Sequence, residues 1–258
     1  MSDAQADFQS GVVRPVECFR SGWQLIREKY WLMLGISIVG VLIAQFVPFS
    51  IAVGPAMCGI YLCLFRLERG QSVKFEHLMR GIDYFLQSFI ATLFMVIPIL
   101  LIVVPAYLVF LGAVIFETAG KQKPGAPPDP DMGITILVGA LLFTLVIFVV
   151  SIVISVLFIF VYPLIVERKL TGVQAVKTSI RAAFANLGGV LGFTLLNIVL
   201  HMVGSLACCV GGYFLIPVHM AAVVVAYRAV FPALPAPEQP VVEQDPNDPN
   251  RSDFDELN

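Results

Sequence analysis

The sequence predicts an all-α membrane protein: a polytopic transmembrane helical bundle of about six spans with three interfacial amphipathic helices. Of its 258 residues, 58% are hydrophobic and only 13% are charged, whereas soluble domains average about 45–50% apolar and about 25% charged residues. Four stretches contain no Asp, Glu, Lys or Arg: 30–65, 84–116, 132–166 and 182–227. Each exceeds the roughly 20 residues that one bilayer span needs. Because the stretches are apolar on every face, they fit helices and not the alternating strands of a barrel.

The first and last uncharged stretches each divide into two spans. Val47-Pro48-Phe49-Ser50 predicts a reversal between spans near Tyr30–Val47 and Ile51–Arg66. Both are short for a bilayer, so a re-entrant hairpin over Tyr30–Arg66 remains an alternative. Gly211-Gly212 separates spans near Leu187–Val210 and Tyr213–Tyr227.

Each middle stretch, at about 1.5 Å per residue, is about 50 Å long, which is too long for one straight crossing and too short for two. We therefore expect one tilted or kinked helix in each, with Pro98 and Pro105 kinking the first.

Basic residues predict the orientation. With six spans, only Lys121 and Lys123 fall on one side, and the other fourteen of the sixteen Lys and Arg residues fall on the opposite side. By the positive-inside rule the basic side is cytoplasmic. Residues 1–29 are polar and contain no apolar core typical of a cleavable signal peptide. We expect a multi-pass protein of the cytoplasmic (inner) membrane with both termini in the cytoplasm.

The chain divides into a disordered N-terminus (1–12), a transmembrane helical domain (13–231) and a disordered, acidic, Pro-rich tail (232–258). The transmembrane domain contains three units of interfacial helix, span and span: 13–66, 72–166 and 171–231. Each unit opens with an apolar stripe at helical spacing beside cations, which is typical of helices that lie among lipid headgroups. The three stripes are Phe19, Trp23, Ile26 and Tyr30; Phe75, Leu78, Ile82 and Phe85; and Val173, Val176, Ile180, Phe184 and Leu187. The candidate headgroup contacts are Arg20, Arg27, Lys74, Arg80, Lys177 and Arg181.

Several segments carry a family resemblance. They are Trp23 through Trp31, Gly54-Pro55-Ala56-Met57-Cys58-Gly59-Ile60-Tyr61 leading to Arg69-Gly70, and Pro163-Leu164-Ile165-Val166-Glu167-Arg168. Over roughly Arg14 to Phe231 the chain resembles uncharacterised bacterial inner-membrane proteins of the YciC-like kind. It is also similar to the membrane domain of some glycerophosphodiester phosphodiesterases. The resemblance implies an all-helical inner-membrane protein and brings no activity or site residues.

A search for chemistry finds no nucleotide-binding loop, nucleophile elbow, zinc-protease motif or paired carboxylate in a span. The five cysteines lack metal-ligand spacing and are interpreted as small apolar residues. We therefore expect no catalytic residues, no metal and no cofactor. One polar face stands out: Thr194, Asn197 and His201 share a face of one predicted span, and His219 of the next span lies at similar depth. Such a face either forms part of a pathway for protons or substrate, or stabilises the bundle through hydrogen bonds between helices. Ser151-x3-Ser155 is interpreted as a small-residue packing face.

Two functions follow from these features. The first is a non-enzymatic scaffold or accessory protein that organises membrane lipids or membrane partners. The acidic tail is either a solvated segment or a docking segment for a cytoplasmic protein. The alternative is a small transporter or channel that uses Thr194, Asn197, His201 and His219. The cations are dispersed over three helices without a nucleic-acid fold, so no nucleic-acid partner is expected.

Overall fold

The computed structural model describes residues 8–46, 51–121, 130–207 and 210–233. Over these ranges the chain forms α- and 3-10 helices and no strand. In chain order the elements are α1 (Pro15–Ile26), η2 (Arg27–Lys29), α2 (Tyr30–Phe46), α3 (Val53–Glu68), α4 (Glu76–Met79), η4 (Arg80–Tyr84), α5 (Phe85–Lys121), α6 (Pro130–Phe158), α7 (Val161–Arg168), α8 (Gly172–Ala185), α9 (Leu187–Ala207) and α10 (Gly211–Val230). The predicted all-α class is confirmed.

Four helical segments of the described chain are long and apolar enough to cross a membrane: Glu76–Phe116, Gly133–Arg168, Leu187–Leu206 and Gly211–Val230. Helices α2 and α3 are shorter, at 17 and 16 residues. At about 1.5 Å per residue each is about 25 Å long, slightly less than the roughly 30 Å hydrocarbon core of a bilayer. The chain is therefore a protein with four membrane-competent helices and one shorter apolar helix pair.

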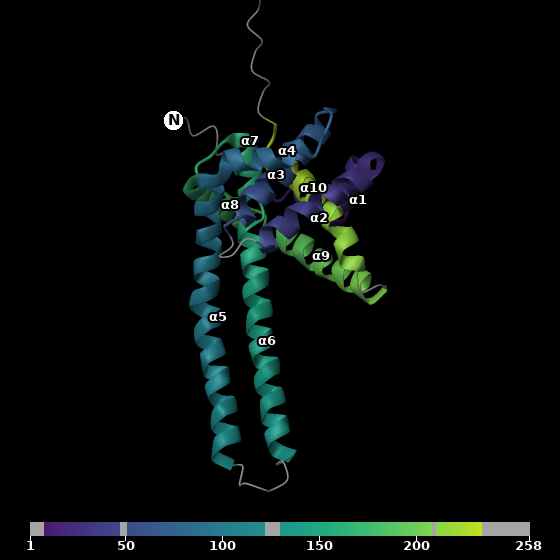
Figure 1. The fold of residues 1–258 in the computed structure, drawn as a ribbon. Helices are drawn as coiled ribbons and strands as arrows, with labels where there is room; N and C mark the ends of the chain where they lie inside the picture. Colours follow the sequence, from purple (N-terminus) through teal and green to yellow (C-terminus); the bar gives the residue numbers. More distant parts are fainter. Residues whose placement is uncertain (1–7, 47–50, 122–129, 208–209, 234–258) are drawn as a thin grey trace, which may run out of the picture.

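Helices α5 and α6 form a hairpin that extends well beyond the other labelled helices (Figure 1). Helix α5 continues as one helix through Pro98 and Pro105. The second middle stretch is different, because the expected single helix is broken at Ile159 and Phe160 into α6 and α7. Pro163 explains the break, since it lacks the N–H that would bond to the carbonyl of Ile159 and its ring clashes with that carbonyl.

A side chain from another helix satisfies the backbone at this break. The hydroxyl of Ser179 in α8 donates a hydrogen bond to the carbonyl of Leu157 (2.7 Å) and accepts one from the N–H of Phe160 (3.3 Å). Ser179 is fully buried. Unpaired backbone groups are expensive inside lipid, so this serine allows α7 to start in a new direction within the core.

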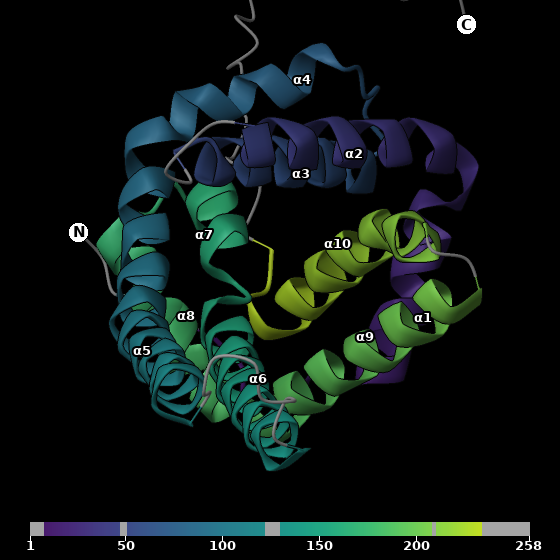
Figure 2. The ribbon, with the colours of Figure 1, turned by 60° about the horizontal axis from the view of Figure 1, so that its bottom comes forward.

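The three helix–hairpin units pack in a cyclic order. The second long helix of each unit contacts the opening helix of the next: α3 packs on α4 and η4, α6 and α7 pack on α8, and α10 packs on α1. The same three units also meet through α3 and α5, α6 and α9, and α10 and α2. Figure 2 shows the pairs α2–α3, α5–α6 and α9–α10 around a common centre. The last unit therefore closes on the first.

Small residues allow several of these helices to approach at backbone distance. A Cβ added to Gly59 of α3 would lie 2.2 Å from the carbonyl oxygen of Leu78, and one added to Gly81 of η4 would lie 2.1 Å from that of Pro55. A Cβ on Gly22 of α1 would lie 2.6 Å from the backbone nitrogen of Ala222 in α10. Close backbone contact through small residues is how helices associate in lipid, where there is no hydrophobic drive between them.

Some sequence predictions fall on the chain ends and loops. The reversal at 47–50, Lys123, Cys208, Cys209 and nearly all of the predicted tail lie outside the described residues. Disorder is expected for 1–12, yet the described residues of this segment contact the bundle. The N–H of Gln9 donates to the carbonyl of Val230 (2.8 Å), and the side chain of Asn186 bonds to both Gln9 and Val12 (2.9 and 3.1 Å). Residues 9–12 therefore link α8 and α10.

Candidate functional site

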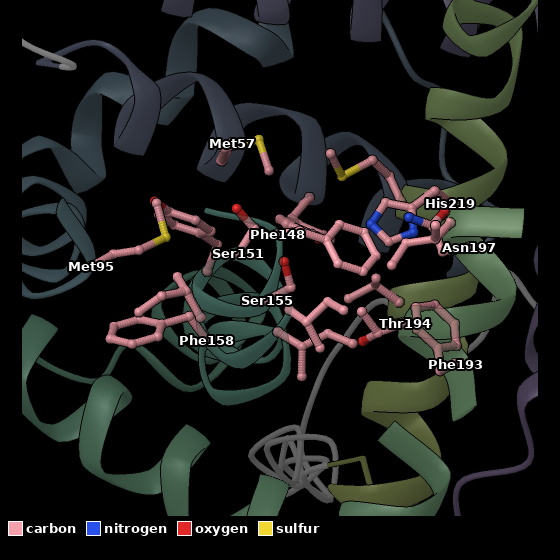
Figure 3. A pocket seen from close by; sticks show the side chains of 18 residues that line it. Met57, Met95, Phe148, Ser151, Ser155, Phe158, Phe193, Thr194, Asn197 and His219 are labelled. Atoms are coloured by element: carbon pink, nitrogen blue, oxygen red, sulfur yellow. The ribbon is translucent and has the colours of Figure 1, made fainter. Parts of the chain in front are cut away.

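A cavity of about 320 Å³ lies where the three units meet. Helices α3, α5, α6, α7, α9 and α10 contribute its walls, so its shape depends on the closure of the whole ring. Its volume is near the lower end of the roughly 300–1,000 Å³ typical of ligand pockets. Figure 3 shows the lining side chains.

Three of the four residues of the predicted polar face line this cavity: Thr194, Asn197 and His219. His201 is not among the lining residues, and its ring centroid lies 6.4 Å from that of His219. The hydroxyl of Thr194 donates a hydrogen bond to the carbonyl of Val190 in its own helix (3.0 Å). In contrast, Asn197 Oδ1 and His219 Nδ1 are buried without a hydrogen-bond partner among the described residues.

The cavity has further polar lining residues that the sequence did not indicate. Ser151 and Ser155 of α6 were interpreted as a helix-packing face, but both are exposed and line the cavity. Tyr61 and Tyr162 also line it, and the Tyr162 hydroxyl is 3.1 Å from that of Thr92. The i, i+4 spacing of the two serines identified a common face of α6, but only the tertiary structure shows that this face meets no helix there.

The lining is amphipathic. In Figure 3, Asn197 and His219 lie at one end of the view, Met95 and Phe158 lie at the other, and Ser151 and Ser155 lie between them. None of the eighteen lining side chains, all within the described chain, is Asp, Glu, Lys or Arg. The exposure of both serines shows that the cavity is open beside α6. The cavity can therefore accept an uncharged molecule that combines an apolar body with a polar group.

Helices α1, α4–η4 and α8 each have one side that packs on the protein and one side that is exposed. Each packs inward through small or medium residues: Cys18, Gly22 and Ile26 in α1, His77, Leu78 and Gly81 in α4 and η4, and Ala175, Ser179 and Ala182 in α8. Large apolar residues of the predicted stripes stay exposed, including Trp23, Phe75, Ile82, Phe85, Val173 and Phe184. The stripes are therefore divided: Ile26 is buried and Phe19 stacks on Phe193, whereas Trp23 and Phe184 are exposed.

The six predicted headgroup cations lie on or beside these helices. Arg20, Arg27, Lys74, Arg80, Lys177 and Arg181 are all exposed. Within the described parts of the chain, none of the six makes an ion pair or side-chain hydrogen bond. They do not converge on one site. Figure 1 shows α1, α4 and α8 at the end where the α5–α6 hairpin is rooted.

A cluster of four charged residues, here called the charge cluster, joins the ends of three helices: Glu68 of α3, Arg69 just after it, Glu167 of α7 and Arg228 of α10. Arg228 donates to both carboxylate oxygens of Glu68 (2.8–3.0 Å) and to Glu167 Oε2 (2.7 Å). Arg69 bonds to Glu167 Oε1 at 3.1 Å. Arg228 also lies over the ring of Phe65, 5.2 Å from its centroid.

The charge cluster contains two Arg and two Glu residues, so its formal charge is balanced. The sequence carried a signal for it: Glu68 and Glu167 lie in the last turns of α3 and α7. Carboxylates are disfavoured there by the helix dipole. An acid at that position therefore indicates a cation from elsewhere in the fold, and Arg228 is the partner of both.

The described residues offer little for metal or thiol chemistry. Nowhere in these ranges do three His, Cys, Asp or Glu side chains gather to hold a metal ion. Cys18, Cys58 and Cys63 are free and buried. Burial raises the pKa of the Cys18 thiol above its ordinary value, so the reactive thiolate is scarce at neutral pH.

These features define an all-helical protein with four helices long and apolar enough to cross a membrane, a cavity lined by uncharged side chains, and exposed cations on the helical segments α1, α4–η4 and α8. Comparison of the chain with models of protein families, with curated proteins and with solved structures finds no match.

Proposed function

We propose that the chain is a non-catalytic, six-span protein of the cytoplasmic membrane that acts as a scaffold or accessory component and organises anionic lipid on its cytoplasmic side. In this topology α2 and α3 also cross the bilayer, both termini are cytoplasmic, and α1, α4 and α8 lie among the headgroups. The acidic tail is a docking segment for a cytoplasmic partner.

One observation carries the proposal: the three amphipathic helices pack through small and medium-sized residues and leave several large apolar side chains and six unpaired cations exposed. Acyl chains suit the exposed Trp, Phe and Ile side chains, and anionic headgroups suit the cations. The exposed cations contrast with Arg69 and Arg228, whose charges are neutralised inside the charge cluster. Helix α8 is the strongest candidate, because it carries Lys177 and Arg181 and no acidic residue.

The test measures anionic lipid retained by the purified protein. Native mass spectrometry measures how much phosphatidylglycerol and how much phosphatidylcholine stay bound to the wild type and to the double variant Lys177→Gln/Arg181→Gln. Each cation contributes about 1 kcal/mol near the surface, so the double variant should bind phosphatidylglycerol about 25-fold more weakly and phosphatidylcholine unchanged.

Arg14→Gln is the matched control, because Arg14 is already paired with Glu17 at 3.2 Å. It should retain wild-type binding. Equal retention of phosphatidylglycerol by the double variant, the control and the wild type would contradict the proposal.

The central cavity supports a second candidate, a small transporter or channel, because Thr194, Asn197 and His219 of the third unit face Ser151 and Ser155 of the second unit across it. Under this candidate, His201→Ala and His219→Ala each fail to restore the phenotype of a deletion strain. Full rescue by both variants at wild-type protein levels would exclude it.

A further inference from the structure

We infer that the central cavity binds an uncharged, single-chain lipid alcohol that enters from the bilayer, with its hydroxyl group between Asn197 and His219. The inference concerns binding only, and it is independent of the interfacial lipid proposed above and of whether the ligand crosses the membrane. It follows from the charge, the hydrogen-bonding groups, the size and the opening of the cavity.

The lining excludes a charged ligand. Among the described residues that form the wall there is no Asp, Glu, Lys or Arg, so an ion in the cavity would have no counter-charge. Burying an unpaired charge is far more expensive than burying a neutral polar group. The ligand is therefore neutral.

The two unpartnered atoms call for a hydroxyl group. Asn197 Oδ1 is an acceptor and needs a donor, whereas His219 Nδ1 donates or accepts according to its tautomer. A hydroxyl both donates and accepts, so one hydroxyl satisfies both residues for either orientation of the amide. A carbonyl or an ether cannot donate to Asn197.

The remainder of the cavity is suited to hydrocarbon. Its walls include Met57, Met95 and Phe158, and the volume of about 320 Å³ is roughly ten times the 30 Å³ that one water molecule occupies. Water in the part of the cavity walled by Met57, Met95 and Phe158 would need polar partners that these side chains do not supply. The volume suits one acyl chain segment and not a two-chain phospholipid.

The opening faces the lipid. Ser151 and Ser155 line the cavity and are also exposed on α6, and Phe148 of the wall is 47% exposed. Because α6 lies within the membrane-competent segment Gly133–Arg168, an alkyl chain can pass from the bilayer into the cavity while its hydroxyl moves inward to Asn197 and His219.

The experiment uses the full chain in proteoliposomes and a twelve-carbon primary alcohol that carries a diazirine on its chain. After illumination, peptide mass spectrometry maps the labelled residues. We expect labelling on the cavity walls. Unlabelled 1-dodecanol should compete for this labelling, and the concentration needed should be about fivefold or more lower than the concentration needed of dodecane, dodecanoate or dodecylammonium. Equal competition by dodecane, or stronger competition by either ion, would overturn the inference.

Two substitutions test the site itself. Asn197→Leu removes the polar group, and Gln45→Leu removes an amide from α2, outside the cavity lining, as its control. Ser155→Phe fills the opening, and Thr144→Phe adds the same ring to α6 outside the lining. In Asn197→Leu, the concentration of 1-dodecanol that suppresses labelling should rise at least about fivefold. In Ser155→Phe, labelling of the cavity walls should be lost. Both control variants should behave as the wild type. Wild-type labelling and wild-type competition in both cavity variants would contradict binding of the alcohol in this cavity.

Discussion

At the scale of single residues, Arg228 holds the ends of three helices together. It joins Glu68, 160 residues away, and Glu167, 61 residues away. The side chain of Glu167 is only 7% exposed, that of Arg228 18% and that of Glu68 27%. Exposed ion pairs contribute little to stability, but removal of one partner from a buried pair leaves an uncompensated charge.

Arg228→Met should therefore lower the free energy of unfolding by about 3–5 kcal/mol. Arg228→Lys should recover only part of this, because an ammonium group cannot reproduce the two-oxygen contact with Glu68. Thermal unfolding in detergent measures both variants. Glu68→Gln is expected to have a smaller effect than Arg228→Met, since Glu68 is more exposed. Wild-type stability of Arg228→Met would show that the charge cluster contributes nothing to the fold.

At the scale of elements, the break between α6 and α7 shows how one helix determines the course of another. Pro163 prevents a continuous helix, and Ser179 of α8 provides the hydrogen bonds that the backbone loses. Helix α7 then enters the core, where its residues Val161 to Val166 are all buried. The proline was visible in the sequence, but its partner on another helix was not.

A double-mutant cycle tests this coupling. Ser179→Ala should lower the free energy of unfolding by about 1–3 kcal/mol, because it leaves buried backbone groups unpaired. In a Pro163→Ala background the same substitution should have a smaller effect, since the helix can continue and pair its own backbone. Guanidinium or thermal unfolding of the four proteins gives the interaction energy. Strictly additive effects would mean that the serine does not compensate for the proline.

At the scale of the whole molecule, the three units close into a ring, and the cavity exists only because they do. Four segments of the described chain are clearly able to span a membrane, and the proposed six-span topology adds α2 and α3. The two topologies differ most at the reversal between these helices. A re-entrant hairpin keeps residues 47–50 away from the outer surface, whereas two full spans bring them there.

Single-cysteine labelling with a membrane-impermeant maleimide decides between them. In a background without native cysteines, we expect Ser50→Cys and Gln122→Cys to react in intact cells. Ser72→Cys should react only after permeabilisation, because it precedes α4 on the proposed cytoplasmic side. Protection of Ser50→Cys in intact cells, with Gln122→Cys still labelled, would favour the re-entrant hairpin and reduce the number of spans to four.

By itself, the sequence determined that the protein is helical, where its long apolar segments lie and which residues give the amphipathic helices their stripes. These properties follow from hydrophobicity and from the periodicity of a helix, which are local. It also picked out Thr194, Asn197 and His219, because polar residues are conspicuous in an apolar stretch.

Only the tertiary structure decided that these three residues share a cavity with Ser151 and Ser155, and that Glu68, Glu167 and Arg228 meet. It also divided each amphipathic stripe into a packed part and an exposed part. The physical reason is that these contacts join helices of different units. Their existence depends on how closely small residues let the backbones approach and on the cyclic order in which the units close, and neither is encoded in a local pattern.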